Sequence, residues 1–284
     1  MKFPVLEMFC SIQGEGKWTG VPSVFIRLAG CNLRCVFGQS RCDTPYSSFE
    51  LEKPKWTSTE EAKQQLMKIL KENPNVDNIV ITGGEPLLYR DSIKDFIEKI
   101  ETPNKSYTYT IETNGTLKAI EPWTSPNGWM YFIDLWSVSP KLSTSVDWDC
   151  KYINEKQRDA HNEMRINVDN LCTYIDATFL AQDATLKIYM PQSESTNVLP
   201  GVQYKFVYSG PDSVDEIKNI LDRIAKKYNY SRKKLDQLVM LMPEGTTNDQ
   251  LSNIQEECAQ VCIREGWRFC DRLHIRIWGD KREV

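Results

Sequence analysis

Short runs of β-branched and aromatic residues alternate with amphipathic helical patterns along most of this 284-residue chain. This alternation narrows the choice of fold more than any other feature, because strands that are joined through helices pair in parallel. We therefore expect one α/β domain, residues 1–284, with a mostly parallel sheet that is closed or partly closed into a barrel. The expected strands are 23–28, 78–82, 107–112, 131–137, 203–208, 237–242 and 273–278.

Three of the connecting helices have clear signals. Two begin with a capping box, formed by Ser58 with Glu61 and by Ser213 with Glu216. A third spans about 249–265, where apolar residues recur on one face. In folds of this class the chemistry lies in the loops after the carboxyl ends of the strands, so we expect the motifs at those ends to face one cavity.

Residues 143–200 break the alternation with polar and irregular sequence, such as Asp147-Trp148-Asp149-Cys150. No internal repeat or low-complexity tract is visible in the chain. We expect an insertion that is packed on the barrel.

Composition narrows the partners and the compartment. With 35 basic and 39 acidic side chains the formal net charge is −4, so we expect no broad cationic surface for nucleic acid. The first residues lack the apolar stretch of a signal peptide, and no run of about 18 uncharged apolar residues could span a membrane. We expect a cytoplasmic protein, in which the nine cysteines are thiols, core residues or metal ligands rather than disulfides.

The densest chemical signal is a loop that carries Cys31, Cys35 and Cys42 directly after an expected strand. Three thiolates can hold three irons of a cubane cluster and leave the fourth iron open. An open iron can chelate S-adenosylmethionine and pass it an electron, which releases a carbon radical. The alternatives are a structural zinc site completed by Cys10, or buried thiols without a ligand.

The same cysteines resemble the signature of the radical S-adenosylmethionine superfamily, in which two residues separate the second and third cysteines. Here six residues separate them, and 38–41 has the form of a polar turn inserted after Phe37. The resemblance implies a partial (β/α) barrel of the radical S-adenosylmethionine type. It also implies that the residue before the third cysteine contacts the adenine, which is Phe37 or, read literally, Arg41.

A motif near the N-terminus resembles 7-carboxy-7-deazaguanine synthases. It consists of Ile12, Gln13, Gly14 and Glu15, followed by Arg27 in the next strand. An amide and a carboxylate suit the donors and acceptors of a pterin edge, and the guanidinium fork suits a carboxylate. The alternatives are an ordinary turn for the glycine and a surface ion pair for the arginine.

Motifs after later strands resemble the segments that hold S-adenosylmethionine in the superfamily. In Thr82-Gly83-Gly84-Glu85 the glycines permit close approach of the backbone and Glu85 offers an acceptor for the ammonium group of the cofactor, while Thr82 faces the substrate. Asn114 and Ser139-Pro140-Lys141 complete the expected cofactor contacts. A plain strand-to-helix turn, and loop capping by Glu112 and Asn114, are the alternatives.

Two more residues have roles implied by the resemblance. Thr44 would bind magnesium beside the substrate, because this strongly hydrated ion normally has few protein ligands. The alternative is that the hydroxyl of Thr44 ends the loop by a side-chain hydrogen bond. His274 would contact the pterin, or be a hydrogen-bonded core imidazole. The other histidine, His161, lies in a polar run and is expected to be solvated.

The resemblance implies a carbon–nitrogen lyase that converts 6-carboxy-5,6,7,8-tetrahydropterin to 7-carboxy-7-deazaguanine with loss of ammonia, in queuosine and deazapurine biosynthesis. Its cofactors would be a 4Fe-4S cluster, S-adenosylmethionine and Mg²⁺. Its partners would be the small pterin and an electron donor such as flavodoxin or ferredoxin, with a homodimer as one possible assembly. The alternatives are a glycyl-radical activase and a non-catalytic metal-binding relative.

Overall fold

The computed structural model describes residues 1–38, 40–50, 53–101, 107–125, 128, 130–146, 149–182, 201–229 and 231–283. Its centre is a nine-stranded sheet in the order β13 (Arg268–Phe269), β12 (Val239–Pro243), β11 (Gly201–Tyr208), β10 (Leu135–Val138), β7 (Thr108–Thr113), β6 (Asn78–Gly83), β2 (Pro22–Leu28), β1 (Lys2–Ile12) and β5 (Lys55–Ser58). Neighbouring strands from β2 to β13 are parallel, and β1 is antiparallel to β2 and β5. The outer strands β5 and β13 are not neighbours, so the predicted partial barrel is confirmed as an open one.

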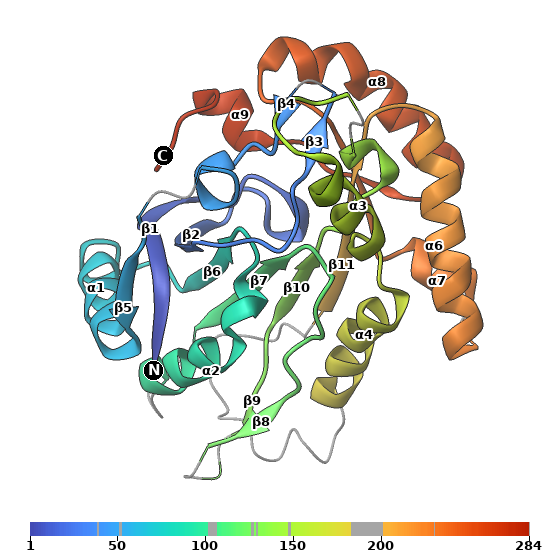
Figure 1. Cartoon of the computed structure of the whole chain (residues 1–284). Helices are drawn as coiled ribbons and strands as arrows, with labels where there is room; N and C mark the ends of the chain where they lie inside the picture. Colours follow the sequence, from blue (N-terminus) through green and yellow to red (C-terminus); the bar gives the residue numbers. More distant parts are fainter. Residues whose placement is uncertain are drawn as a thin grey trace.

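Helices lie around the outside of the curved sheet (Figure 1). The longer ones are α1 (Thr59–Glu72), α2 (Arg90–Ile100), α4 (Val168–Gln182), α6 (Asp212–Tyr228) and α8 (Asn248–Glu265). The shorter elements are η1 (Gly16–Trp18), β3 (Val36–Phe37), β4 (Ser40–Arg41), η2 (Pro45–Ser47), η3 (Pro86–Tyr89), β8 (Trp123–Thr124), β9 (Met130–Tyr131), η4 (Ser143–Ser145), α3 (Glu155–Met164), α7 (Arg232–Asp236) and α9 (Leu273–Trp278). The capping box of Ser58 with Glu61 opens α1 as predicted.

One large hydrophobic cluster lies between the sheet and these helices. Trp136 of β10 and Tyr174 of α4 pack edge to face with ring centroids 5.2 Å apart, and Phe3 of β1 packs in the same way on Phe96 of α2 at 5.5 Å. Burying a large apolar side chain contributes about 1.5–3 kcal/mol. These contacts hold α2 and α4 against the sheet.

The first part of the polar segment 143–200 contains η4, α3 and α4. Helix α4 connects β10 to β11 and packs on α6 and β11, with Leu171, Tyr174 and Ile175 buried. It thus occupies the place of a crossover helix. Residues 183–200 lie outside the described residues. The interpretation of the whole segment as an insertion stays a prediction.

The predicted strand 273–278 is wrong, because this segment is helix α9. Its alternation of apolar and polar residues matches a strand, but charge pairs with distant parts of the chain fix the residue at its start. The side chain of Arg272 binds Glu15 and Asp43, and the N–H of Arg276 donates to the carbonyl of Arg272 at 3.2 Å. Strand preference depends on context, and here the anchored arginine sets the start of a helical turn.

Three smaller predictions also need correction. The strand β1 was not expected, because Pro4 and Glu7 interrupt its apolar pattern, yet it pairs on both sides. The predicted strand 131–137 is split into β9 and β10 around Asp134, whose carboxylate accepts from the N–H of Tyr109 at 2.7 Å. The predicted capping box of Ser213 with Glu216 does not form at the start of α6. The carboxylate of Glu216 accepts from the N–H of Ser143 at 2.8 Å instead.

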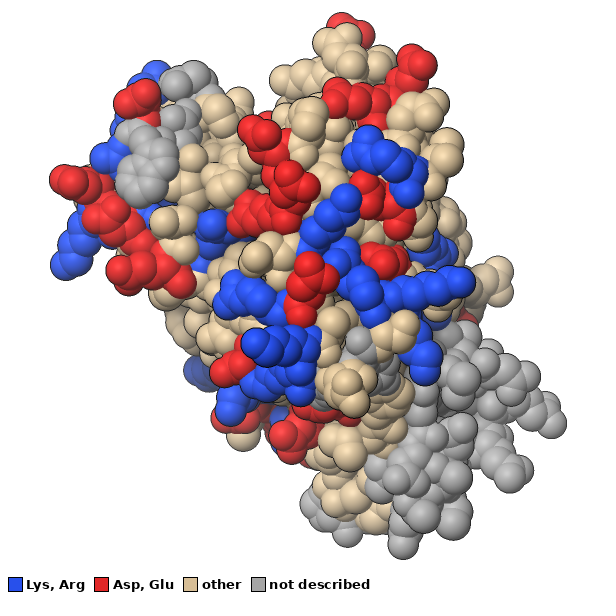
Figure 2. Space-filling model, turned by 90° about the vertical axis from the view of Figure 1, so that its right-hand side faces the viewer, with Lys and Arg blue, Asp and Glu red and all other residues tan. Residues whose placement is uncertain are grey.

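The surface over α6 and α7 carries charges of both signs. Figure 2 shows basic and acidic side chains interleaved over the face that α6 and α7 cover. Ion pairs on this side include Lys218 with Glu265 at 2.8 Å and Arg232 with Asp222 at 2.5 Å. Among the described residues, no helix combines the length and the apolar character that crossing a bilayer requires.

Candidate active site

A cavity of about 790 Å³ opens at the carboxyl ends of β2, β6, β7, β10, β11 and β12. This is the location predicted from the strand-end motifs, and nearly all the candidate residues line it. Two do not: Glu85 and Pro140. Those that line it are Ile12, Gln13, Gly14, Glu15, Arg27, Cys31, Cys35, Phe37, Cys42, Thr44, Thr82, Gly83, Gly84, Asn114, Ser139, Lys141 and His274.

The cysteine loop contains a β-hairpin, made of β3 (Val36–Phe37) and β4 (Ser40–Arg41). Strands β3 and β4 pair antiparallel, Val36 with Arg41 and Phe37 with Ser40, and Gly38 turns the chain with φ +53°. One step beyond this ladder, the N–H of Cys42 donates to the carbonyl of Cys35 at 3.0 Å. Residues opposite each other in such a pair project to the same face. The long spacing therefore still brings the second and third cysteines together.

The two faces of this hairpin differ. Cys35, Phe37 and Cys42 line the cavity, whereas Val36 is fully buried against Cys150 and Ile153 on the other side. Arg41 pairs with Val36 across the hairpin, and although it also borders the cavity, its guanidinium lies 4.8 Å from the ring centroid of Tyr152. The strand pairing places Phe37, and not Arg41, on the same face of the hairpin as Cys35 and Cys42.

The pKa values of all three thiols are raised. Burial raises the pKa of Cys31 and of Cys42, and raises that of Cys35 to about 12, while the charge of Lys141 lowers all three. Within the described part of the chain, no three Cys, His, Asp or Glu side chains form a ready site for a single metal ion. A cubane cluster spaces its ligands more widely, because each thiolate binds a different iron.

Cys10 does not join these thiols. Its neighbours Phe9 and Ser11 line the cavity, so along strand β1 Cys10 points to the other face, where it packs on the hydrophobic core. The zinc alternative completed by Cys10 therefore has no geometric support. The expected core thiols Cys150, Cys172, Cys258, Cys262 and Cys270 are buried.

Glu85 lies beneath the cavity and braces its floor. Its carboxylate accepts from the N–H of Leu87 at 2.9 Å, from the N–H of Asn114 at 2.7 Å, and from the hydroxyl of Thr113. Burial raises its pKa, although these hydrogen bonds oppose the shift. The side chain is 0% exposed, so it holds η3 and the end of β7 together rather than facing the cavity.

We expect Glu85→Gln to lower the free energy of unfolding by about 1–3 kcal/mol. The new amide group is a donor, and it must face the N–H of either Leu87 or Asn114, which leaves two donors opposed. Urea denaturation of the metal-free protein measures the loss, with the exposed Glu121→Gln as the control. Equal stability of Glu85→Gln and wild type would contradict the bracing role.

Close packing explains the second glycine of the Gly83-Gly84 pair. A Cβ on Gly84 would lie 2.2 Å from the carbonyl oxygen of Gly30 and 2.8 Å from the Cβ of Cys31. The N–H of Glu85 donates to the same carbonyl at 2.8 Å. The glycine motif therefore lies directly against the start of the cysteine loop. Asn114 reaches this loop as well, since its amide donates to Asn32 at 3.0 Å.

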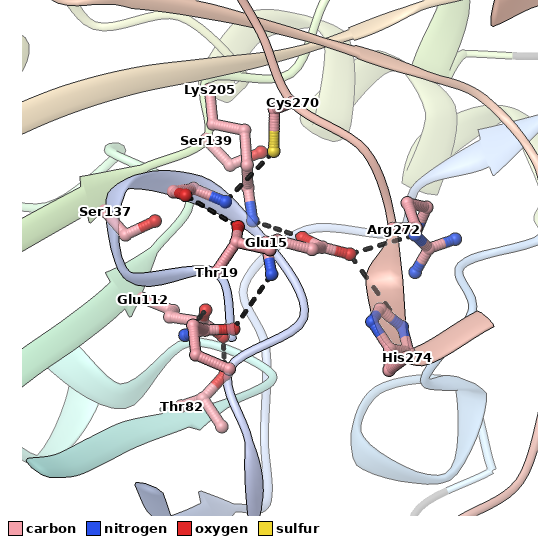
Figure 3. A network of polar contacts seen from close by, with 12 residues as sticks. Glu15, Thr19, Thr82, Glu112, Ser137, Ser139, Lys205, Cys270, Arg272 and His274 are labelled. Carbon is pink, nitrogen blue, oxygen red and sulfur yellow. Dashed lines mark hydrogen bonds and ion pairs between the residues drawn. The ribbon is translucent and has the colours of Figure 1, made fainter. Parts of the chain in front are cut away.

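A buried charge network forms one wall of the cavity (Figure 3). Lys205 approaches the carboxylate of Glu15 from one side, and Arg272 and His274 approach it from the other. Arg272 Nε lies 2.9 Å from Glu15 and its Nη2 lies 2.5 Å from Asp43. Burial alone would raise the pKa of Glu15, but Lys205 and Arg272 hold it well below its usual range. The carboxylate is therefore ionised at neutral pH.

Glu112 joins this wall to the end of β6. It accepts from the amide of Gln13 at 3.1 Å and from the hydroxyl of Thr82 at 2.9 Å, and all three line the cavity. The sequence motifs suggest loop capping as one role for Glu112, and they assign no role to Lys205 or Arg272. Two residues could have indicated this network from the sequence. Lys205 and Glu112 are charged side chains within predicted buried strands, and a charged side chain is costly to bury unless it is paired.

Arg27 makes a half-buried ion pair rather than one at the surface. Its Nε donates to Glu7 at 2.5 Å, and the side chain of Glu7 is 1% exposed. Arg282 donates to the other oxygen of Glu7 at 3.1 Å and stacks on Tyr46, with its guanidinium 3.6 Å from the ring centroid. The last residues of the chain thus come to the cavity wall beside the arginine that was expected to bind a carboxylate.

Thr44 and His274 both line the cavity, in settings that the sequence does not indicate. The hydroxyl of Thr44 donates to Asp43 at 3.1 Å, and Asp43 is held by Arg272. His274 is on helix α9 and not on a strand, and its ring packs on Gly14, where a Cβ would lie 2.0 Å from its Nδ1. The glycine is needed there for space.

Comparison with known proteins identifies relatives over the whole chain. The family model of the radical SAM superfamily matches residues 25–143. A 7-carboxy-7-deazaguanine synthase from Halobacterium salinarum is 34% identical, with 99% of this chain and 92% of the relative covered. One from Rhodopirellula baltica is 32% identical, with 98% and 87% covered. The crystal structure of QueE from Escherichia coli has the same fold, with a TM-score of 0.54 and 22% identity over 96% of this chain and 95% of that one.

Proposed function

This chain belongs to the 7-carboxy-7-deazaguanine synthase family of radical S-adenosylmethionine enzymes, and from that premise we propose its reaction. The substrate is 6-carboxy-5,6,7,8-tetrahydropterin, and the product is 7-carboxy-7-deazaguanine, formed with loss of ammonia. The step belongs to queuosine and deazapurine biosynthesis. One observation supports it most: a single cavity joins three cysteines of one loop to a wall of paired polar side chains.

The cofactors of this enzyme class are a 4Fe-4S cluster, S-adenosylmethionine and Mg²⁺. Together the cluster and S-adenosylmethionine supply, when bound, the radical that takes a hydrogen atom from the substrate. Cys31, Cys35 and Cys42 are the proposed cluster ligands, and the hairpin that turns two of them to one face supports the assignment. Thr44 is the proposed magnesium ligand.

The residues proposed to hold S-adenosylmethionine lie on the cysteine side of the cavity. They are Phe37, Gly83, Gly84, Asn114, Ser139 and Lys141. Pro140 is buried outside the lining, and Glu85 acts from below by fixing Asn114. Lys141 donates to Ser139 at 2.8 Å, which places a positive charge near the thiols and near any carboxylate bound there.

The opposite wall is proposed to orient the pterin. Gln13 and Thr82 both bind Glu112, and Glu15 is fixed by its two cations, so the wall offers donors and acceptors that are already in place. Preorganised groups of this kind cost little reorganisation when the substrate binds. Ile12, Gly14, Arg27 and His274 complete the proposed contacts.

The direct test incubates anaerobically reconstituted protein with reductant, S-adenosylmethionine, Mg²⁺ and the carboxytetrahydropterin. Mass spectrometry should detect 7-carboxy-7-deazaguanine. A protein that holds a cluster and cleaves S-adenosylmethionine, but leaves the pterin unchanged, would overturn the proposed substrate. A glycyl-radical activase would instead need an open face that accepts a polypeptide. The wall of paired charges in this cavity does not favour that alternative.

Thr82→Val tests the substrate wall. The variant keeps the shape of the side chain but removes the hydroxyl that positions Glu112. We expect kcat/KM for the pterin to fall about tenfold, because one hydrogen bond in the wall is lost. Iron content should stay unchanged. Thr108→Val at the far end of β7 is the control, and equal kinetics of the two variants would contradict the role of Thr82.

We further propose flavodoxin or ferredoxin as the electron donor, the cytoplasm as the compartment and a homodimer as the assembly. The first follows from the need of the reaction class for a one-electron reductant. A cytoplasmic location is supported by a set of cysteines that are free thiols in the structure.

A further inference from the structure

His161, the histidine outside the cavity lining, is buried against the cysteine loop. It lies on α3, which packs beside the β3–β4 hairpin (Figure 1), and it is 1% exposed. The polar run around it predicted a solvated ring, and that prediction is wrong. Its Nδ1 lies 3.0 Å from the backbone nitrogen of Arg34, and its Nε2 lies 3.0 Å from the hydroxyl of Ser145.

Hydrogen bonding fixes the tautomer of this ring. The backbone nitrogen of Arg34 can only donate, so Nδ1 must carry a lone pair. The hydroxyl of Ser145 already donates its hydrogen to the carbonyl of Leu142 at 2.6 Å, so Nε2 must be the donor to Ser145. Burial lowers the pKa of His161 to about 4, with Arg165 and Lys141 adding to the effect, so the ring is neutral at pH 7.

The residue that His161 holds lies between two proposed cluster ligands. Arg34 directly precedes Cys35, and its guanidinium donates back to the carbonyls of Cys31 at 2.7 Å and Leu33 at 2.8 Å. Arg34 thus makes the loop between the first two cysteines a rigid unit, and His161 ties this unit to α3.

The other side of Cys35 is attached to the same part of the molecule. Val36 packs on Cys150 and Ile153, which come shortly before α3 in the chain. Both neighbours of Cys35 are therefore anchored outside the barrel, one by a hydrogen bond and one by apolar contact. The histidine contact is the directional one of the two anchors, because it is a hydrogen bond to a single backbone N–H.

We infer that His161 is a positioning residue for the cysteine loop, which fixes Cys35 by accepting the hydrogen bond of the Arg34 backbone. The consequence for a cluster rests on the proposed function, but the effect on the loop does not. A ligand loop that is held in place before the metal arrives needs less reorganisation, and groups that orient ligands commonly tune a metal site.

Two amide variants separate the two sides of the ring. In His161→Asn the amide oxygen can reach the position of Nδ1 and still accept from Arg34. In His161→Gln the amide reaches the position of Nε2 instead, and the N–H of Arg34 loses its acceptor. Hydrogen exchange of the Arg34 amide is measured in the metal-free full-length protein, by mass spectrometry with fragmentation to single residues.

We expect the Arg34 amide to exchange about tenfold faster in His161→Gln than in wild type, and close to wild type in His161→Asn. Ser145→Ala, which leaves the imidazole in place but removes its second partner, should give a smaller increase. This variant keeps the test open if His161→Gln does not fold. Unchanged exchange in both His161→Gln and Ser145→Ala would overturn the inference.

A second readout concerns the loaded protein. After anaerobic reconstitution, the cluster of His161→Gln should lose its visible absorbance in air several-fold faster than wild type, and its reduced form should show altered electron paramagnetic resonance g values. His161→Asn should restore both towards wild type. If wild-type protein takes up no cluster, the proposed function fails, while faster exchange at Arg34 still supports the role of His161. Equal cluster lifetimes in all variants would contradict an effect of His161 on the cluster and would limit its positioning role to the metal-free loop.

Discussion

Replacing Cys42 by alanine should leave a folded protein that no longer retains a four-iron cluster and no longer forms 7-carboxy-7-deazaguanine. Cys42 lies opposite Cys35 across the hairpin, and both line the cavity together with Cys31. With one thiolate removed, the loop offers only two ligands for three irons. Iron and sulfide analysis after anaerobic reconstitution should give about four irons per chain for wild type and far fewer for the variant.

The control for this experiment is Cys172→Ala, which removes a thiol that is buried on α4 and absent from the cavity lining. It should keep wild-type iron content and turnover, with at most a modest loss of stability from the small void. Circular dichroism confirms that both variants fold. Undiminished turnover by Cys42→Ala would show that Cys42 is no cluster ligand, and the proposed cofactor site would have to be abandoned.

Several of the predicted parts of the site follow from one property of parallel sheets. Carboxyl ends of neighbouring parallel strands meet at one edge, so motifs such as Thr82-Gly83-Gly84 and Ser139-Pro140-Lys141 had to converge once the strands were recognised. The strand signals themselves were strong because the central strands are buried on both faces. The same reasoning failed for 273–278, where alternation without a neighbouring strand does not make a strand.

The parts that could not be predicted depend on contacts between residues far apart in the chain. Glu15 is paired with Arg272 and Lys205, which are 257 and 190 positions away, and Glu7 is paired with Arg282 over 275 positions. No local pattern encodes such pairs. Glu85 illustrates the same limit, because its motif suggests a ligand contact, while its actual partners are backbone groups that only the fold brings to it.

The spacing of the cysteines leads to the second prediction. We expect deletion of Gly38 to Arg41 to retain the cluster, whereas moving the third cysteine by one position, as Arg41→Cys with Cys42→Ala, should lose it. In the hairpin the N–H of Cys42 donates to the carbonyl of Cys35 at 3.0 Å. After the deletion, Cys35 and Cys42 would be the first and last residues of a four-residue turn, which closes with the same hydrogen bond.

A cysteine at position 41 cannot come opposite Cys35 in this way. Position 41 projects to the face of Val36, which is buried on Cys150 and Ile153, because side chains alternate along a strand. Shifting the thiol by one residue therefore turns it away from Cys35, although the number of cysteines is unchanged. Iron content and the electron paramagnetic resonance spectrum of the reduced protein distinguish the two variants. A full cluster in the moved-cysteine variant, or none in the deletion, would show that the ladder of the hairpin does not decide where the third thiol lies.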